Sequence, residues 1–191
     1  KIGKEKNINI KVVEKGQMIN IENNFLKDLN GTIIRDKNYY ENLFKEVESE
    51  DGHIYIHEDE LKDGYIIYFI NNENIFVREL YYNNLNALKG ILRFLYNHNT
   101  QCKKVTISSP IDDKIRFILS NPKTANIKLK PFMMGRVINF KKYLESLNIK
   151  SNENLSINIS VKDDFIKENN KIFKINLNNN KLNVESGDYI P

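Results

Sequence analysis

The chain has 191 residues, of which 40% are hydrophobic and 28% are charged, and its formal net charge is +4. This apolar content is enough for a packed core. Nucleic-acid binders gather Lys and Arg on one face, whereas here Lys is interleaved with Glu, Asp and Asn, so we expect no nucleic-acid partner. No apolar run reaches the roughly 18 to 20 residues that cross a bilayer, so we expect no membrane span. The single Cys excludes an internal disulfide and predicts a reducing compartment, the cytoplasm.

The first quarter of the chain predicts one strand and two helices. It begins KIGKEKNINI, without Met and without the apolar core of a signal peptide, so we expect a piece of a longer protein. NINIKVV (7–13) alternates polar and apolar residues as a strand does. A helix is expected over about 15–29, where apolar residues recur at helical spacing. Asp36 is typical of the N-cap of a second helix, whose inward stripe runs over 39–47.

Residues 51–82 give the clearest sheet signal. HIYIH, GYIIYFI and NIFVRELYY are three β-rich runs separated by turn sequences. The strongest helix follows, from Asn84 to about His98, with Asn83 or Asn84 as its cap. The strand KKVTIS (103–108) comes directly after it. Three antiparallel strands and a strand–helix–strand step predict an α/β (α+β) fold with a mixed sheet flanked by helices.

Residues 109–147 form the seam of the chain. They predict a short helix after a proline, a turn, two apolar strands broken at Lys130–Pro131, and a second helix. We therefore expect the first domain to cover 1–147. The remainder, 148–191, reads as three short alternating strands that cannot bury much apolar surface on their own.

Several passages of the chain resemble one protein family. GYIIYFI followed by FVREL, SPIDD with IRFILSNP, and FMMGRVINFKKYL are similar to successive parts of the enhanced-intracellular-survival type of GNAT N-acetyltransferase. LSINISVKDDFIKENNKIFKI resembles the opening strands of the sterol-carrier-protein-like domain that ends those proteins. The resemblance covers nearly the whole chain. It implies that 1–147 is the second GNAT-like domain, with the acyl-CoA N-acyltransferase fold, and that 148–191 is the truncated start of the sterol-carrier-like domain.

The resemblance also locates the place where acetyl-CoA would bind in a GNAT domain. Its pyrophosphate lies in a turn of the pattern Gln/Arg-x-x-Gly-x-Gly/Ala, at the N-terminus of a helix. The corresponding passage here, RELYYNNLNALKG, has Asn83 and Asn84 in that turn, and Gly90 falls inside the helix. Without glycine the backbone cannot approach a pyrophosphate closely, so we expect no cofactor site and no catalytic residue in this segment. The catalytic domain and the catalytic C-terminal carboxylate of the family would both lie outside it.

The function that the resemblance implies belongs to the longer protein. That protein would be a bacterial N-acetyltransferase that uses acetyl-CoA as cosubstrate and acetylates a small-molecule or peptide amine. This chain would supply scaffold, one wall of the amine cleft and contacts of a homo-oligomer. An alternative is a non-catalytic, sterol-carrier-like module that binds an apolar ligand, although the tail is short for enclosing a cavity of several hundred Å³.

Four residues of the seam are candidates for the wall of the substrate cleft. They are Phe132, Met133, Met134 and Arg136. Two Met side chains beside a Phe form a soft, adaptable apolar surface, and the family's amine cleft borders this passage. Core packing is the simpler interpretation of the three apolar residues and the one that we favour.

Two pairs of carboxylates have the residue types for acid–base chemistry but simpler roles fit them better. Asp112–Asp113 precedes a predicted helix, whose N-terminus favours negative charge. Asp163–Asp164 is typical of a hairpin turn. If Arg136 is buried it needs an acidic partner, and we expect this partner in Asp112–Asp113.

The histidines and the cysteine suggest no further site. His53 and His57 have the spacing of zinc ligands on a helix, but in a strand they lie too far apart for one metal, and no third ligand is near. We expect histidines at the edges of turns and no metal. Cys102 lies beside Lys103 and Lys104, which can activate a thiol, but it lacks a neighbouring His or acid, so we expect an ordinary cysteine.

Overall fold

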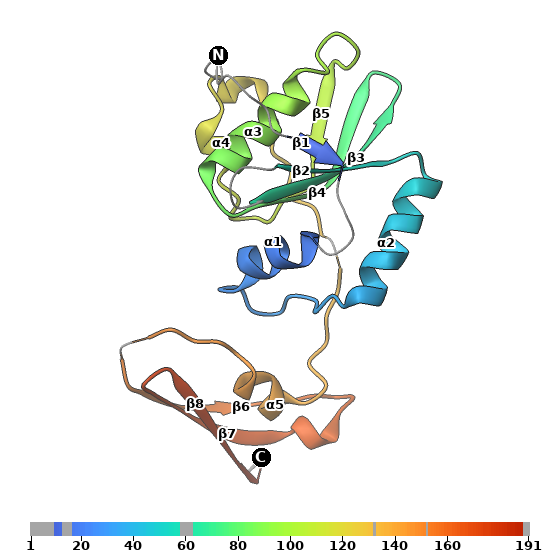
Figure 1. Cartoon of the computed structure of the whole chain (residues 1–191). Coiled ribbons are helices and arrows are strands. Elements are labelled where there is room, and N and C mark those ends of the chain that lie inside the picture. The colour runs from blue at the N-terminus through green and yellow to red at the C-terminus, as the bar shows by residue number, and fades with distance from the viewer. Residues whose placement is uncertain (1–9, 13–16, 58–62, 132, 152, 189–191) are drawn as a thin grey trace. The chain divides into compact units, whose positions relative to one another are not determined.

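The computed structural model shows two groups of helices and strands along the chain (Figure 1). The residues that it describes are 10–12, 17–57, 63–131, 133–151 and 153–188. Contacts divide the chain into two compact units, of which the first comprises Lys1–Lys27 and Thr32–Leu129, and the second Asp28–Gly31 and Lys130–Pro191. This division falls earlier than the domain boundary predicted after residue 147. Within the described residues, every helix is too short or too polar to cross a membrane.

A mixed sheet forms the centre of the first unit. Its five strands, in the spatial order β1-β2-β3-β4-β5, are β1 (Ile10–Val12), β2 (His53–His57), β3 (Gly64–Asn71), β4 (Asn74–Tyr82) and β5 (Lys104–Ile107). The first four strands pair antiparallel, and β4 and β5 pair parallel. The mixed α/β sheet predicted from the sequence is therefore confirmed.

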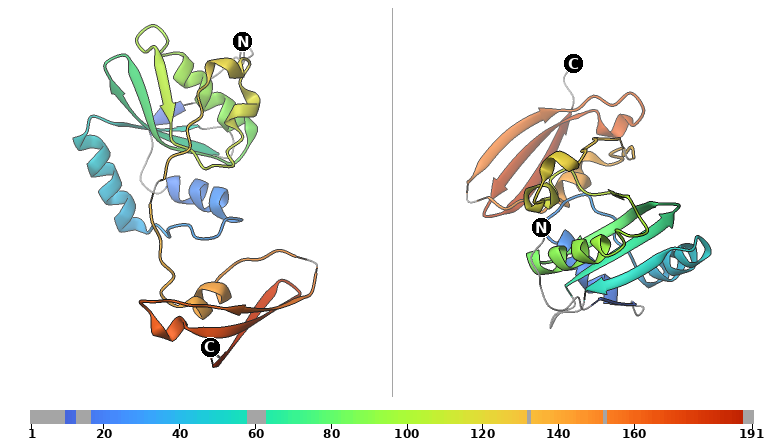
Figure 2. Two further views of the ribbon diagram at one scale, coloured as in Figure 1. Left: turned by 180° about the vertical axis from the view of Figure 1, so that it is seen from behind. Right: turned by 90° about the horizontal axis from the view of Figure 1, so that it is seen from above.

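Helices cover both faces of this sheet because its central strand is apolar on both sides. The helices are α1 (Gln17–Leu26), α2 (Lys37–Ser49) and α3 (Leu85–Tyr96). In β3, Tyr65 and Ile67 pack with α1 and α2, whereas Ile66 and Tyr68 pack with α3. Figure 2 shows α3 and the α1–α2 pair on different sides of the sheet. A strand buried on both faces reads as a continuous apolar run, as GYIIYFI does.

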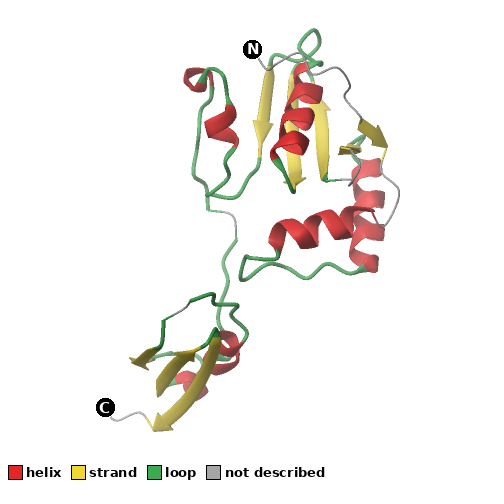
Figure 3. Cartoon of the chain, turned by 60° about the vertical axis from the view of Figure 1, so that its left-hand side comes forward, coloured by secondary structure: helices red, strands yellow, loops and turns green. Residues whose placement is uncertain are grey.

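The seam differs from the prediction. It contains α4 (Ile115–Ile118), the 3₁₀ turn η1 (Pro122–Thr124) and α5 (Phe140–Glu145), with loop between them (Figure 3). The two strands predicted around Lys130–Pro131 are wrong, since 125–131 and the described residues of 133–139 contain no strand. Ile127 and Leu129 alternate with polar residues but are 72% and 79% exposed. An alternating segment is compatible with a β-strand, but a strand also needs a neighbouring strand to pair with. Pro131 in addition lacks the backbone N–H that would donate to such a neighbour.

The second unit contains the three strands predicted from its alternating residues. They are β6 (Leu155–Ser160), β7 (Lys171–Asn178) and β8 (Lys181–Asp188), all antiparallel in the order β6-β7-β8, with the 3₁₀ turn η2 (Lys167–Asn169) before β7. Phe140 of α5 packs on Phe173, with ring centroids 4.9 Å apart. Asn179 and Asn180 have positive φ (48° and 63°), the conformation that a tight hairpin turn requires. Residues 179–180 thus connect β7 and β8 as an ordinary hairpin turn.

Candidate functional site

The turn between β4 and α3 is the candidate site, since a GNAT domain would hold the pyrophosphate there. Asn84 has an extended backbone and caps α3, its side-chain oxygen accepting a hydrogen bond from Ala87 N at 2.9 Å. The amide nitrogen of the same side chain donates to the carboxylate of Asp63. The backbone N–H of Asn83 donates to the carbonyl oxygen of Asp63 at 2.7 Å. The backbone N–H of Asn83 and the side-chain amide of Asn84 therefore already donate hydrogen bonds within the protein.

Asp63 places a carboxylate at the N-terminus of α3. It immediately precedes β3 and is only 4% exposed. Its second partner is His57, the last residue of β2, whose Nδ1 lies 2.8 Å from Asp63 Oδ1. The ring of His57 is buried as well. A helix N-terminus stabilises negative charge, and at α3 the chain itself supplies this charge through the carboxylate of Asp63. We call His57, Asp63 and Asn84 the α3 cap cluster.

Gly90 serves the packing of this cluster. A Cβ atom at Gly90 would lie 2.4 Å from both Cδ2 and Nε2 of His57. Only glycine lets α3 approach the His57 ring this closely. The one glycine of RELYYNNLNALKG, Gly90, is thus explained by its contact with the His57 side chain, about one and a half turns into the helix.

Strands β4 and β5 stay paired over only part of β4. Their parallel ladder runs from Asn74 to Val77, and Ser108 N then donates to Val77 O at 3.1 Å. Strand β4 itself continues to Tyr82. The hydroxyl of Tyr82 donates to Asp113 Oδ1 at 3.1 Å, and burial raises the pKa of Tyr82 to about 12. This contact joins the end of β4 to the chain beyond β5.

Asp113 also contacts the start of the short helix α4, before which the sequence predicted a capping role for this pair of carboxylates. Its Oδ1 accepts from Ile115 N at 2.7 Å. The N-cap position itself is occupied by Lys114, which makes no capping hydrogen bond through its side chain.

A second polar cluster, which sequence reasoning missed, lies buried on the α1–α2 side of the sheet. Arg35 Nε contacts Glu22 Oε1 at 3.1 Å, and its Nη1 contacts Glu79 Oε2 at 3.0 Å. Tyr40 donates to Glu22, and Tyr65 donates to Glu79 at 3.1 Å. Two carboxylates thus share one guanidinium. We call these five residues the Arg35 cluster.

Burial dominates the electrostatics of the Arg35 cluster. It raises the pKa of Glu22 above the ordinary value, against the hydrogen bond from Tyr40 and the charge of Arg35, which lower it. Glu22 is 2% exposed, so no substrate in solution reaches it without movement of α1. The one signal in the sequence was spacing, because Glu22 continues the inward stripe of Met18 and Phe25. The Arg35 cluster stabilises the fold and offers no open site.

The described candidates for a substrate-cleft wall, Met133, Met134 and Arg136, do not come together in one pocket. Phe132 lies outside the described residues. Met133 and Met134 are 65% and 100% exposed, which does not fit core packing within this chain. Arg136 is exposed too, and with 135–139 it borders an open surface hollow of about 460 Å³. The cleft-wall role stays a prediction.

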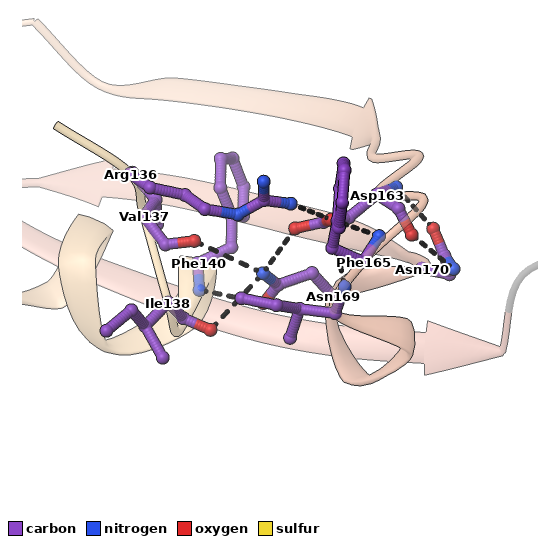
Figure 4. A network of polar contacts seen from close by, with 9 residues as sticks. Arg136, Val137, Ile138, Phe140, Asp163, Phe165, Asn169 and Asn170 are labelled. Carbon is purple, nitrogen blue, oxygen red and sulfur yellow. Dashed lines mark hydrogen bonds and ion pairs between the residues drawn. The ribbon is translucent and has the colours of Figure 1, made fainter. Parts of the chain in front are cut away.

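The partner of Arg136 is Asp163, so the predicted pairing with Asp112–Asp113 is wrong. Figure 4 shows the contact, in which the guanidinium also lies 4.4 Å from the centre of the Phe165 ring. The Arg136 side chain is exposed, whereas the predicted pairing assumed that it is buried. Its partner comes from the loop between β6 and β7.

Asp163 forms a turn, as predicted. Its Oδ1 accepts from Ile166 N and Phe165 N, both at 2.9 Å, and these hydrogen bonds lower the pKa of Asp163 to about 2. Asn169 links the turn to the seam, because its Nδ2 donates to Asp163 Oδ2 at 3.2 Å and to Ile138 O at 3.3 Å (Figure 4). The network holds the end of the seam on the C-terminal sheet and contains no group poised for catalysis.

The remaining candidates have structural environments. His53 and His57 are the first and last residues of β2, at the strand ends where they were predicted. The ring of His53 lies beside Tyr68, with ring centroids 5.1 Å apart, and His57 also belongs to the α3 cap cluster. Across the described part of the chain, no group of three or more His, Cys, Asp and Glu could hold a metal. Cys102 is buried, and its backbone N–H donates to His98 O at 2.8 Å, where α3 ends.

Comparisons with known proteins agree with the mixed α/β fold. The model of an acetyltransferase (GNAT) domain family matches residues 31–137. A GCN5-related N-acetyltransferase from Anabaena variabilis has a similar structure (TM-score 0.81, 22% identity, covering 93% of this chain and 48% of that one). So has a probable N-acyltransferase from Enterococcus faecalis (TM-score 0.76, 21% identity, 93% and 47%). Eis1 from Mycobacterium abscessus is more distant (TM-score 0.64, 16% identity, 96% and 48%). The chain spans about half the length of these structures, and a search of curated protein sequences finds no match.

Proposed function

The chain belongs to the acetyltransferase (GNAT) domain family, and on that premise we propose that it is a catalytically silent GNAT-like domain of a longer N-acetyltransferase. The second unit would be the start of a sterol-carrier-like domain. The longer protein would be a bacterial, cytoplasmic homo-oligomer that transfers acetyl from acetyl-CoA to a small-molecule or peptide amine. This segment would supply scaffold and one wall of the amine cleft, at Phe132, Met133, Met134 and Arg136.

The observation that carries the proposal is the carboxylate of Asp63 at the N-terminus of α3. A pyrophosphate bound there would meet a buried carboxylate held by His57 and Asn84. Two like charges about 4 Å apart repel by about 4 kcal/mol at an effective dielectric constant near 20. That repulsion weakens binding by about three orders of magnitude, before the missing glycines are considered. Acetyl-CoA in the longer protein would therefore bind elsewhere.

The length of the similar structures supports the second half of the proposal. This chain aligns with about half of each of them, so those proteins have room for a further domain of comparable size. In a working acetyltransferase the amine nitrogen attacks the thioester carbon, backbone N–H groups stabilise the oxyanion, and the C–S bond then breaks to release the CoA thiol. Those groups would belong to the further domain.

A substitution in the first turn of α3 tests the proposal in the longer protein. Asn86 is exposed and makes none of the contacts of the α3 cap cluster. Asn86→Asp adds a carboxylate that the helix N-terminus tolerates but that would repel a bound pyrophosphate. Asn86→Gln is the neutral control. Acetyl transfer is followed by the release of free CoA thiol.

We expect both variants to keep kcat/KM for acetyl-CoA within about twofold of the wild-type value. A loss of tenfold or more in Asn86→Asp, but not in Asn86→Gln, would show that this turn binds the cosubstrate. An absence of acetyl transfer to any amine by the longer wild-type protein would contradict the enzyme assignment itself.

A further inference from the structure

The Arg35 cluster contains one more negative charge than positive charge. Glu22 and Glu79 are its two carboxylates, and Arg35 is its one guanidinium, which contacts both of them at 3.0–3.2 Å. The side chains of all three are at most 14% exposed. A buried charge without a partner is costly, and a buried carboxylate avoids this cost by binding a proton. The count of charges therefore indicates that the cluster holds one proton.

The groups around the cluster leave this charge unbalanced. Arg78, the residue before Glu79 on β4, pairs with Glu46 at 2.9 Å. Four phenols also face the two carboxylates, namely Tyr39 and Tyr40 on α2, Tyr65 on β3 and Tyr81 on β4. Burial raises the pKa of each phenol, so these hydroxyls keep their protons near neutral pH and add no charge.

The hydrogen bonds indicate where the proton of the cluster lies. Tyr65 Oη is 3.1 Å from Glu79 Oε2 and 3.3 Å from Glu22 Oε2, but it carries only one hydrogen. When Tyr65 donates to Glu79, a hydrogen bond between Tyr65 and Glu22 forms only if Glu22 supplies the hydrogen. A proton on Glu22 Oε2 completes this contact by donating to Tyr65 Oη. Burial raises the pKa of Glu22, which favours the same position.

Helix α1 joins the cluster through Glu22. The partners of Glu22 lie outside α1, since Arg35 precedes α2 and Tyr40 lies on α2. The buried residues of α1 are Met18, Ile21 and Glu22. A helix of 10 residues is too short to be stable alone in water, so its packing on the sheet depends on these few side chains. The protonation of Glu22 therefore bears directly on whether α1 stays packed.

We propose that α1 is a proton-dependent latch on the sheet of the first unit. Glu22 is protonated while α1 is packed against β3 and β4, and it releases this proton to water when α1 detaches. A rise in pH therefore loosens the side of the sheet that α1 covers. The latch does not depend on whether the chain binds acetyl-CoA, so its tests leave the silent-domain proposal untouched.

The sign and the size of the effect follow from proton linkage. The ordinary pKa of a Glu carboxyl is 4.5, and burial raises the pKa of Glu22 above this value while α1 is packed. Between these two pKa values the packed helix keeps the proton, whereas the detached helix has lost it. Each pH unit in this interval favours detachment by up to about tenfold, and the effect levels off above the raised pKa.

Amide hydrogen exchange of the whole chain measures this opening. Exchange at residues 24–26 of α1 is compared between wild type and Glu22→Gln at each pH, so that the pH dependence of the chemical exchange step cancels. Gln keeps the shape of protonated Glu but has no carboxyl proton to lose. We expect the ratio of the wild-type rate to the variant rate to rise at least about threefold from pH 5 to pH 8. A smaller rise, or a fall, would overturn the proposal.

Two controls establish that the effect is specific to Glu22 and local to α1. Glu48→Gln neutralises an exposed carboxylate on α2 and should keep the wild-type pH dependence. Local detachment exposes less surface than unfolding, so exchange in α1 should depend less on low concentrations of urea than exchange in α3, on the other side of the sheet (Figure 2). Equal urea dependence in both helices would show that α1 opens only when the whole unit unfolds, which would also overturn the latch.

Carbon-13 NMR of the Glu22 carboxyl tests the proton itself and does not depend on the folding of a variant. In the wild-type chain this resonance, assigned through its own side-chain protons, should titrate with a midpoint above 4.5. A midpoint at or below 4.5 would contradict the proposal, because the packed helix would then hold no proton for detachment to release.

Discussion

The replacement Arg35→Met tests whether the Arg35 cluster holds the first unit together. The substitution keeps an apolar stem but removes the guanidinium that Glu22 and Glu79 share at 3.0–3.2 Å. Breaking a buried ion pair by removing one partner costs about 3–5 kcal/mol, because a buried charge is left unpaired. Arg35 also lies 4.7 Å from the centre of the Tyr39 ring, a contact that Met replaces only in part. The loss is large against a total stability of about 5–15 kcal/mol.

Urea unfolding followed by circular dichroism measures the effect. Lys37→Met is the matched control, since Lys37 is 86% exposed and pairs with Glu41 at 4.0 Å, a contact worth about 0.5 kcal/mol or less. Adding Glu22→Gln to Arg35→Met removes one unpaired carboxylate and should recover part of the loss. A loss below about 1 kcal/mol in Arg35→Met, equal to that of the control, would refute this account of the cluster.

Two further substitutions test the buried polar groups. Because burial raises the pKa of Glu22, its charged form opposes folding, and the contribution of Glu22 to the unfolding free energy should fall as the pH rises from about 4.5 through that raised pKa. Glu22→Gln lacks this fall, so the difference in unfolding free energy between wild type and variant should shrink from pH 5 to pH 8; a difference that grows would contradict the sign. Gly90→Ala should lose about 1–3 kcal/mol despite the better helix propensity of Ala, because its Cβ collides with His57. Gly135→Ala, with no atom within 4 Å of its Cβ, is the control and should be neutral in the same urea titration.

Local sequence was sufficient for most of the first unit. The alternation of HIYIH and the continuous apolar run of GYIIYFI fixed β2 and β3, and the capping roles of Asp36 and Asn84 depended on neighbours three residues away. The same local rules failed around Lys130–Pro131. The apolar residues there alternate as in a strand, but no neighbouring strand pairs with them. A local pattern cannot show whether such a neighbour exists.

The polar clusters depended on contacts between distant parts of the chain. Glu22 and Glu79 are joined by Arg35 across 57 positions of sequence, and only the fold brings them together. The pairing of Arg136 with Asp163, 27 positions apart, is similar, since no local pattern distinguished Asp163 from Asp112–Asp113 as the partner. In contrast, the unusual turn at Asn83 and Asn84 was visible in the sequence, because the absence of glycine is a local fact. What the sequence did not show was the carboxylate of Asp63 beside it.

Calorimetric titration of acetyl-CoA into this chain tests the silent-domain claim most directly. With Asp63 at the N-terminus of α3 and no glycine in the turn, we expect no saturable heat up to about 1 mM ligand, which corresponds to a binding free energy weaker than about 4 kcal/mol. Saturable binding with a micromolar Kd, reversed by an excess of CoA, would contradict the claim and would make this turn a working acetyl-CoA site.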